Sequence, residues 1–365
     1  MRAVNHQQLG KMAEKSYYTR VPLFVWGATG IGKSEQIKAT AKKIAKDMGL
    51  PFSDGFADSK TFGFIDMRLS QYDPSDLRGL PHVVEGTGEK KELLTTWAFP
   101  DTLPRLGKGI LILDEVNLAP PLVQSSAYQL VLDRKLGNYE VPEGWAIIAA
   151  GNRLEDKAHI FEMARPLCNR FTHIELAIPA IDDWVQWATF NGVDSRITTY
   201  LLWKPSFLYK LPETKVNEQA FPTPRSWGKY CSALMKSIDT EDYDEALLAA
   251  ACCVGDGVAQ EFVAYLKLSK KIDILKLLEH PEKIKEIEGI DMKYTILSAL
   301  VEIAKKKPKE NLEKVIATTD YLEPEFSILL FRFLKYGIKD FVKLVQGNTK
   351  IAQALRQYGK YLIED

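Results

Sequence analysis

The stretch that decides the fold reads Gly27-Ala28-Thr29-Gly30-Ile31-Gly32-Lys33-Ser34. It fits the pattern G-x-x-x-x-G-K-[ST], in which the backbone N–H groups of a glycine-rich loop surround phosphate oxygens. The apolar run VPLFVW at residues 21–26 predicts a buried strand, and residues 34–41 predict the start of a helix. Because the motif requires this order of strand, loop and helix, we interpret residues 27–34 as a phosphate-binding loop and not as a chance glycine-rich turn.

The residue types of this loop predict which groups contact a nucleotide. Gly27, Gly30 and Gly32 allow the backbone to curl so that its N–H groups point inward, and the following helix adds the positive end of its dipole. Lys33 has the length and charge to reach the outer phosphates, and the Ser34 hydroxyl suits Mg²⁺. All eight residues are therefore candidates for binding ATP or ADP, and Ser34 is also a candidate metal ligand.

Length and composition describe an ordinary globular chain, with 365 residues for about two domains. Basic and acidic residues number 48 each, a balance that argues against a protein built mainly to coat nucleic acid but is compatible with a local basic stripe. No window approaches the roughly 18 apolar residues of a membrane span, and the first residues lack the apolar segment of a signal peptide. The four cysteines lack the spacing of a metal site. We therefore expect a cytoplasmic protein with reduced thiols.

Strand and helix patterns alternate up to about residue 180. The further strands are expected at 64–69, 109–115, 145–150 and 171–176, with a helix opening at 120 and hairpins around 82–97 and 136–144. Residues 73–81 contain Pro, Asp and Gly and are expected to break regular structure. The alternation predicts an α/β fold with a mainly parallel sheet and flanking helices. From 181 onward the apolar spacing is helical, so we divide the chain into an α/β core at 1–180, a helical part at 181–275 and a helical C-terminal extension at 276–365.

Two adjacent carboxylates, Asp114 and Glu115, are the expected partners of the phosphate-binding loop. They follow a continuous apolar run, which is typical of a parallel strand buried on both faces. We expect this strand to lie next to the one that leads into the loop. At the carboxyl edge of the sheet, Asp114 can hold Mg²⁺ through water, and Glu115 can polarise the attacking water as a base. The alternative is a pair of surface acids at a strand end.

Three further polar residues follow the later strands. Asn152 ends the strand at 145–150 and can hydrogen-bond a γ-phosphate or its water, although its position alone is equally typical of a turn. Arg165 and Arg170 come just before the last strand, and either could complete a neighbouring subunit's site as an arginine finger. Composition alone favours ordinary surface arginines at both positions.

With Asn169-Arg170-Phe171 and Pro222-Thr223-Pro224-Arg225-Ser226-Trp227, these motifs resemble the AAA+ ATPases. More narrowly, the chain is similar to the MoxR-like group of the helix-2-insert clade, in the dynein-related AAA subfamily, over residues 21 to about 230. The resemblance implies that residues 27–34 are Walker A and that 181–275 form a helical lid. It further implies that 76–97 occupy the helix-2 insert position and 136–144 the presensor-1 hairpin. The single residues that it assigns are Asp114 and Glu115 as Walker B, Asn152 as sensor 1, Arg170 as the arginine finger with Arg165 as the second candidate, and Arg225 as sensor 2.

The resemblance also implies a function. It predicts an ATPase, which converts ATP and water to ADP and phosphate. The ATPase is expected to form a homo-oligomeric ring, and the expected ring is a hexamer. Such a ring would remodel client proteins or complexes as a chaperone does, with a von Willebrand factor A-domain partner. A nucleic-acid motor, such as a restriction or translocation subunit, is a second class, but Lys90 and Lys91 in the hairpin are balanced by nearby glutamates. A nucleotide-gated scaffold with little hydrolysis is a third, and the intact Glu115 and Arg170 argue against it.

Overall fold

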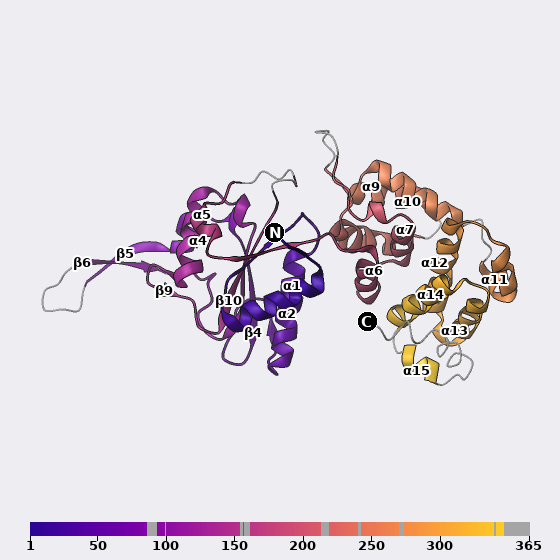
Figure 1. Ribbon diagram of the computed structural model, residues 1–365, viewed down its shortest axis with the longest axis horizontal. Helices are drawn as coiled ribbons and strands as arrows, with labels where there is room; N and C mark the ends of the chain where they lie inside the picture. Colours follow the sequence, from indigo (N-terminus) through magenta and orange to yellow (C-terminus); the bar gives the residue numbers. More distant parts are fainter. Residues whose placement is uncertain are drawn as a thin grey trace. The chain divides into compact units, whose positions relative to one another are not determined.

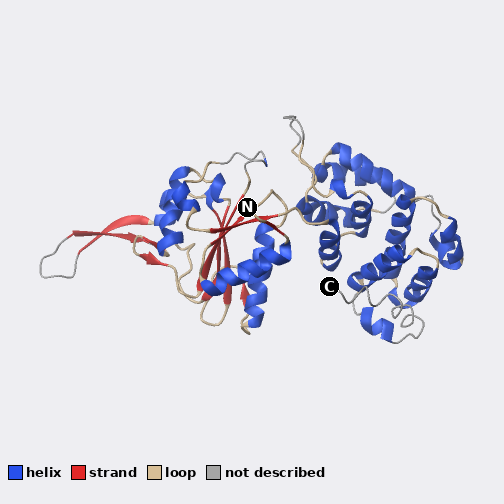
Figure 2. Cartoon of the chain, viewed as in Figure 1, coloured by secondary structure: helices blue, strands red, loops and turns tan. Residues whose placement is uncertain are grey.

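The computed structural model describes residues 1–85, 93–98, 100–153, 156, 161–212, 219–239, 242–269, 274–338 and 341–346 (Figure 1). The chain divides into two compact units, Met1–Pro179 and Ala180–Asp365. All strands of the described residues belong to the first unit, and the second is built from helices (Figure 2). The predicted order of an α/β part followed by a helical part is thus confirmed, while the functional division at residue 275 stays a prediction.

The first unit is organised around a seven-stranded sheet in which every pair of neighbouring strands is parallel. Its strands, in spatial order, are β1 (Ala3–Val4), β11 (Thr172–Leu176), β2 (Leu23–Trp26), β10 (Trp145–Gly151), β7 (Lys108–Asp114), β4 (Phe62–Arg68) and β3 (Phe52–Ser53). One expectation is wrong: β7, which carries Asp114, does not lie next to β2. β10 lies between them, with Ala149 opposite Phe24 on one side and Leu113 on the other.

The central strands are buried because helices cover both faces of the sheet. Figure 1 shows α1 (His6–Thr19) and α2 (Lys33–Asp47) on one side, and α4 (Pro121–Asp133) and α5 (Arg165–Cys168) on the other. All residues of β10 and the apolar run of β7 are buried, as expected for parallel strands covered twice. The indole of Trp145 fits against the sheet because its neighbours are glycines: a Cβ at Gly63 would lie 2.5 Å from the ring.

The two predicted hairpins are present and project from the sheet domain. β5 (Leu80–Glu85) pairs antiparallel with β6 (Leu93–Ala98), and β8 (Lys135–Leu136) pairs antiparallel with β9 (Tyr139–Glu140). Residues 86–92, which connect the first pair and include the predicted loop with Lys90 and Lys91, lie outside the described residues. The Asn138 amide donates to the Thr96 hydroxyl at 3.2 Å, so the hairpins contact each other.

Residues 73–81 differ from their expected irregular structure. They contain a short helix, α3 (Pro74–Arg78), which begins after a capping box formed by Asp73 and Asp76. Pro74 stands at the first helical position, where its missing N–H has no cost, and Gly79 ends the helix. The residues that suggested a break are therefore the start and stop signals of a single helical segment.

The helices of the second unit share one continuous hydrophobic cluster, which runs from Trp184 to Phe341. A π-helical turn (Ser226–Cys231) precedes α8, and a 3₁₀ turn (Pro281–Glu286) lies between α11 and α12. None of the helices in the described part of the chain is long and apolar enough to cross a membrane. The helices are α6 (Ile181–Phe190), α7 (Ser195–Trp203), α8 (Ser232–Ser237), α9 (Tyr243–Val254), α10 (Asp256–Ser269), α11 (Ile274–Glu279), α12 (Ile290–Lys306), α13 (Pro308–Ala317), α14 (Pro324–Gly337) and α15 (Phe341–Gln346).

Candidate nucleotide-binding site

The loop at 27–34 leads from the carboxyl end of β2 into the first turn of α2. Gly30 and Gly32 have φ angles of 77° and 97°, in the region that favours glycine, so the loop can turn sharply before the helix. The Gly27 N–H donates to the Gly151 carbonyl at 3.2 Å, which ties the start of the loop to the end of β10. The sequence therefore folds into the predicted strand–loop–helix unit, whose helix N-terminus favours anions.

The buried ammonium group of Lys33 closes this loop. Its Nζ donates to the carbonyls of Gly27 and Ala28 at 2.6 and 2.9 Å, and to the Asn152 Oδ1 at 3.1 Å. These acceptors compensate for the loss of water around the charge. Lys33 at the start of α2 and Asn152 just after β10, two predicted site residues, are thus in direct contact.

The Ser34 hydroxyl and the Asp114 carboxylate form the second contact between predicted residues. The Ser34 Oγ donates to the Asp114 Oδ2 at 2.5 Å, and the Glu115 N–H donates to Oδ1 at 2.8 Å. A hydroxyl and a carboxylate are oxygen ligands of the kind that Mg²⁺ prefers, with phosphate and water oxygens completing the shell. The residues present therefore fit a magnesium ion bound together with a nucleotide.

Glu115 is held in an uncommon conformation beside this pair. Its φ of 56° places it in the left-handed region, which costs energy for a residue other than glycine and is often found at functional sites. Its Oε2 accepts a short hydrogen bond from the Ser70 hydroxyl, which lies in the 3₁₀ turn (Leu69–Gln71) after β4. The predicted base is therefore engaged by a neighbour that the sequence did not single out.

Asn117 is a second residue that the sequence reading missed. Its side chain is 1% exposed, its Nδ2 donates to the Asn152 carbonyl at 2.7 Å, and its Oδ1 accepts from the Asn152 N–H at 3.1 Å. A Cβ at Gly151 would lie 2.6 Å from that Oδ1, which explains the glycine there. Asn117 thus fixes the backbone that carries the Asn152 amide. A polar residue just after Asp114 and Glu115 was the only available signal.

Asp66 adds a third carboxylate near the carboxyl ends of β4 and β7. Although its side chain is more than a third exposed, loss of hydration at the sheet edge, followed by the negative charge of Asp114, raises its pKa above the usual value. Arg68 on the same strand acts in the opposite direction. Ionised carboxylates therefore repel one another at this edge, where a divalent cation would relieve the repulsion.

Of the three predicted arginines, Arg165 and Arg170 belong to the first unit and Arg225 to the second. The Arg170 guanidinium lies 3.2 Å from the centroid of the Tyr128 ring, and its Nη1 is 3.5 Å from the Pro166 carbonyl. Arg165 is exposed at the start of α5. Among the described contacts, neither forms a hydrogen bond or ion pair with the loop of its own chain. Arg225 belongs to the second unit, where it is exposed at the start of the π-helical turn, a feature often found at functional sites.

A histidine connects the strand of the phosphate-binding loop to the segment with Arg165 and Arg170. Trp26, whose indole only donates, gives a hydrogen bond to His173 Nδ1 at 3.0 Å. The other ring nitrogen, Nε2, then carries the proton and donates to the Cys168 carbonyl at 2.7 Å. The contacts therefore define a neutral His173 with its proton on Nε2.

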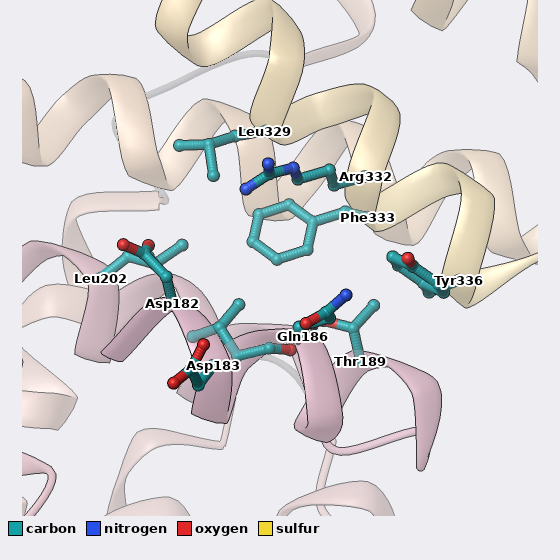
Figure 3. A pocket seen from close by; sticks show the side chains of 10 residues that line it. Asp182, Asp183, Gln186, Thr189, Leu202, Leu329, Arg332, Phe333 and Tyr336 are labelled. Carbon is teal, nitrogen blue, oxygen red and sulfur yellow. Dashed lines mark hydrogen bonds between the residues drawn. The ribbon is translucent and has the colours of Figure 1, made fainter. Parts of the chain in front are cut away.

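A separate cavity of ≈ 270 Å³ lies within the second unit. Figure 3 shows it between α6 and α14, with the carboxylates of Asp182 and Asp183 on one side and Arg332 beside the Phe333 ring on the other. None of the predicted site residues lines it. The predicted nucleotide site and this cavity are therefore different features of the chain.

Comparisons with known proteins give no relative by sequence: no protein-family model and no curated protein matches the chain. Similar solved structures include a point mutant of RuvB from Thermotoga maritima, with 12% identity, a TM-score of 0.36, and coverage of 77% of this chain and 74% of that one. NtrX from Brucella abortus in complex with ADP has 14% identity, a TM-score of 0.32, and coverage of 97% and 68%. A DNA polymerase III gamma subunit-related protein from Thermotoga maritima has 14% identity, a TM-score of 0.31, and coverage of 96% and 91%. Such TM-scores carry no functional argument, so any assignment depends on the residues described above.

Proposed function

We propose that this chain is an AAA+ ATPase that binds Mg²⁺-ATP at residues 27–34 and hydrolyses it. The observation that carries the proposal is that polar groups from the ends of two strands contact two consecutive residues of the loop, Lys33 and Ser34. Lys33 contacts Asn152 at the end of β10, and Ser34 contacts Asp114 at the end of β7. A phosphate-binding loop, a metal carboxylate and a polar amide are thereby assembled at one edge of a parallel sheet, where α/β folds bind their ligands.

Each residue has a distinct task in the proposed hydrolysis. The loop N–H groups and Lys33 bind the phosphates, with Lys33 exchanging its carbonyl contacts for phosphate oxygens. Ser34 and Asp114 would hold Mg²⁺, which when bound would supply positive charge to neutralise the phosphates. Water attacks the γ-phosphorus, Glu115 takes its proton, and the bond from phosphorus to the bridging oxygen breaks to release ADP.

One of the remaining roles, that of Arg170, requires an assembly of several copies. We propose that Asn152 positions the attacking water and that Arg170 acts on the site of a neighbouring subunit, with Arg165 as the alternative. Arg225 would act as a sensor from the helical lid. The role of Arg170 predicts a homo-oligomeric ring, and the family resemblance favours a hexamer. We propose that the ring works in the cytoplasm, as expected from the cysteine pattern.

The client is proposed to be a protein or protein complex, remodelled in a chaperone-like manner with a von Willebrand factor A-domain partner. The hairpin of β5 and β6 supports a protein client because it exposes large apolar side chains, Leu80 at 67%, Val83 at 64% and Leu93 at 75%. Apolar exposure of this kind suits polypeptide surfaces better than phosphate backbones. The nucleic-acid motor therefore stays the second candidate.

The enzyme assignment is tested by ATP turnover of Lys33→Ala and Glu115→Gln beside the wild type. Both variants should lose nearly all hydrolysis, and Glu115→Gln should keep nucleotide binding. Lys38→Ala is the matched control, since Lys38 lies on the same helix but pairs with the exposed Asp54. Wild-type turnover no faster than that of either variant would overturn the assignment and favour the scaffold.

The client is sought with the Glu115→Gln variant held in ATP. A site that binds but does not hydrolyse ATP should keep the assembly on its client during affinity capture. Lys33→Ala, which cannot bind the phosphates, is the matched negative control. A client recovered equally with both variants would not depend on nucleotide and would count against the remodelling role.

A further inference from the structure

The first residue of α1 contacts the phosphate-binding loop directly. His6 Nε2 lies 2.7 Å from the carbonyl oxygen of Ile31. Because a carbonyl oxygen only accepts hydrogen bonds, this ring nitrogen carries a proton and donates it. The contact joins a side chain at the start of the chain to the peptide between Ile31 and Gly32, in the middle of the loop.

We propose that His6 is a positioning residue, which holds the Ile31–Gly32 peptide in the orientation that presents the Gly32 N–H to a nucleotide phosphate. The role presupposes the nucleotide site proposed above. In a trans peptide the C=O and N–H groups point in opposite directions. A carbonyl held outward by His6 therefore turns the Gly32 N–H away from His6 and toward the interior of the loop.

The loop needs such a restraint because of its glycine. Gly32 has a φ of 97°, and glycine populates positive and negative φ with similar ease. Rotation of this peptide would reverse its N–H and carbonyl groups and place an oxygen where a phosphate should bind. A hydrogen bond from outside the loop selects one of the two orientations before the ligand arrives, and preorganisation of this kind strengthens binding.

His6 is itself held firmly. Asn5 caps α1 by accepting from the Gln8 N–H at 2.8 Å, and the Gln8 side chain accepts from the Asn5 N–H at 3.1 Å. The preceding strand β1 pairs with β11, and the salt bridge of Glu14 with Lys43 at 2.8 Å joins α1 to α2. His6 is thus fixed against the helix that follows the loop.

The space beside Gly32 is filled by the same ring. A Cβ at Gly32 would lie 3.5 Å from His6 Nε2 and 3.9 Å from its Cδ2. The imidazole is half-buried and therefore both packs against the loop and donates to it. A variant that keeps the packing but lacks the donor distinguishes the two contributions of the His6 ring.

The test compares His6→Leu, which fills the space without a donor, with His6→Gln, whose amide can donate. Gln7→Ala is the control, because Gln7 is exposed on the same helix. Equilibrium affinities for ADP and for adenosine are measured, together with the thermal midpoint of the ligand-free protein. We expect His6→Leu to weaken ADP binding about tenfold, or about 1.4 kcal/mol, with adenosine affinity and the midpoint unchanged. His6→Gln should recover most of the ADP affinity.

Equal ADP affinity for the Leu and Gln variants would overturn the proposal. So would a loss that affects ADP and adenosine alike, since the hydrogen bond acts only through the phosphates. A wild type that binds no ADP would overturn the proposed function itself, and the positioning role with it. Wild-type binding that the Leu variant retains in full would overturn the positioning role alone.

Discussion

The Ser34 hydroxyl donates to the Asp114 carboxylate at 2.5 Å, although the strand that leads into the Ser34 loop and the strand that carries Asp114 are not neighbours. β10 stands between the loop strand β2 and the carboxylate strand β7. The first turn of α2 spans this separation and brings Ser34 to Asp114. The distance between the strands leaves room for Asn152, at the end of β10, to contact Lys33 in the same site.

Replacing the Asp114 carboxylate should weaken the binding of Mg²⁺ at the Ser34–Asp114 pair. Asp114→Asn retains the shape and an acceptor but removes the charge that attracts Mg²⁺. We expect the Mg²⁺ concentration for half-maximal turnover to rise by about 10- to 100-fold, the range seen when groups that support a metal site are lost. Asp54→Asn, an exposed acid paired with Lys38, is the control. An unchanged Mg²⁺ titration would remove Asp114 from the metal site.

The hydrogen bond from Ser70 should restrain Glu115 in the state without a client. The carboxylate oxygen that accepts this hydrogen bond has to be released before it can accept a proton from water. Ser70→Ala should therefore raise basal turnover by about tenfold or more at constant KM, since a hydrogen bond to a charged group is worth about 1.5–3 kcal/mol and about 1.4 kcal/mol is a factor of ten. Ser70→Thr keeps the hydroxyl and should behave as the wild type. A fall in kcat for Ser70→Ala would show instead that Ser70 orients Glu115 for catalysis.

Asn117 should be required for both stability and turnover. Asn117→Leu leaves the N–H and carbonyl of the half-buried Asn152 without their side-chain partner, at a cost of up to about 1–3 kcal/mol for each unsatisfied group. We expect a loss of about 2–4 kcal/mol in the free energy of unfolding by denaturant and a lower kcat. Asn138→Leu on the exposed hairpin is the control. Equal stability of the two variants would contradict the structural role of Asn117.

The phosphate-binding loop and its strand and helix were predictable because the motif fixes backbone conformation over eight consecutive residues. The central strands β2, β7 and β10 were predictable from their continuous apolar runs, whereas the two-residue strands β1 and β3 were not predicted. Their spatial order was not, since β2, β7 and β10 are all apolar and nothing local distinguishes a central neighbour from a more distant one. This is why Asp114 was expected on the strand adjacent to the loop.

Ser70, Asn117 and His6 escaped prediction for a related reason. Each is an ordinary polar residue whose importance arises from a contact with a residue far away in the sequence, 45 positions for Ser70 and 25 for His6. A sequence motif contains only residues that are close together in the sequence. Residues that hold the motif in place come from other segments, and the fold must be known before they can be found.

Asp66 should make the folded state less stable at neutral pH than at mildly acidic pH. Its pKa is raised in the fold, so the folded state binds the proton more tightly than the unfolded chain, whose value is near 3.8. Its contribution is present below that value and is lost as the pH rises through the folded pKa. Asp66→Asn should therefore stabilise the protein at pH 7 by about 0.5 kcal/mol, a value reduced for partial exposure. No gain at pH 7 relative to pH 4, measured by denaturant unfolding, would contradict this.

The two hydrogen bonds of His173 should affect turnover, through the segment with Arg165 and Arg170, more than they affect nucleotide affinity. His173→Phe retains an aromatic ring beside Trp26 but removes both hydrogen bonds. We expect kcat to fall several-fold, because the segment with Arg165 and Arg170 loses its attachment to β2, while ADP affinity stays within about twofold of the wild type. His82→Phe on the β5–β6 hairpin controls for the substitution. Loss of ADP affinity in His173→Phe would place its effect in the loop.

Complementation between two inactive variants should reveal whether Arg170 acts on a neighbour. Lys33→Ala destroys its own loop but can still donate Arg170, whereas Arg170→Ala keeps an intact loop and lacks the donor. Each alone should be inactive, with Arg170→Ala lowering kcat by about 10³-fold or more, as arginine fingers do. A mixture of the two should regain turnover, because some intact loops then receive Arg170 from a Lys33→Ala neighbour. The same mixture with Arg165→Ala is the control. Full activity of Arg170→Ala by itself would transfer the role to Arg165. If the two variants co-assemble but their mixture has no ATPase activity, Arg170 does not act across subunits.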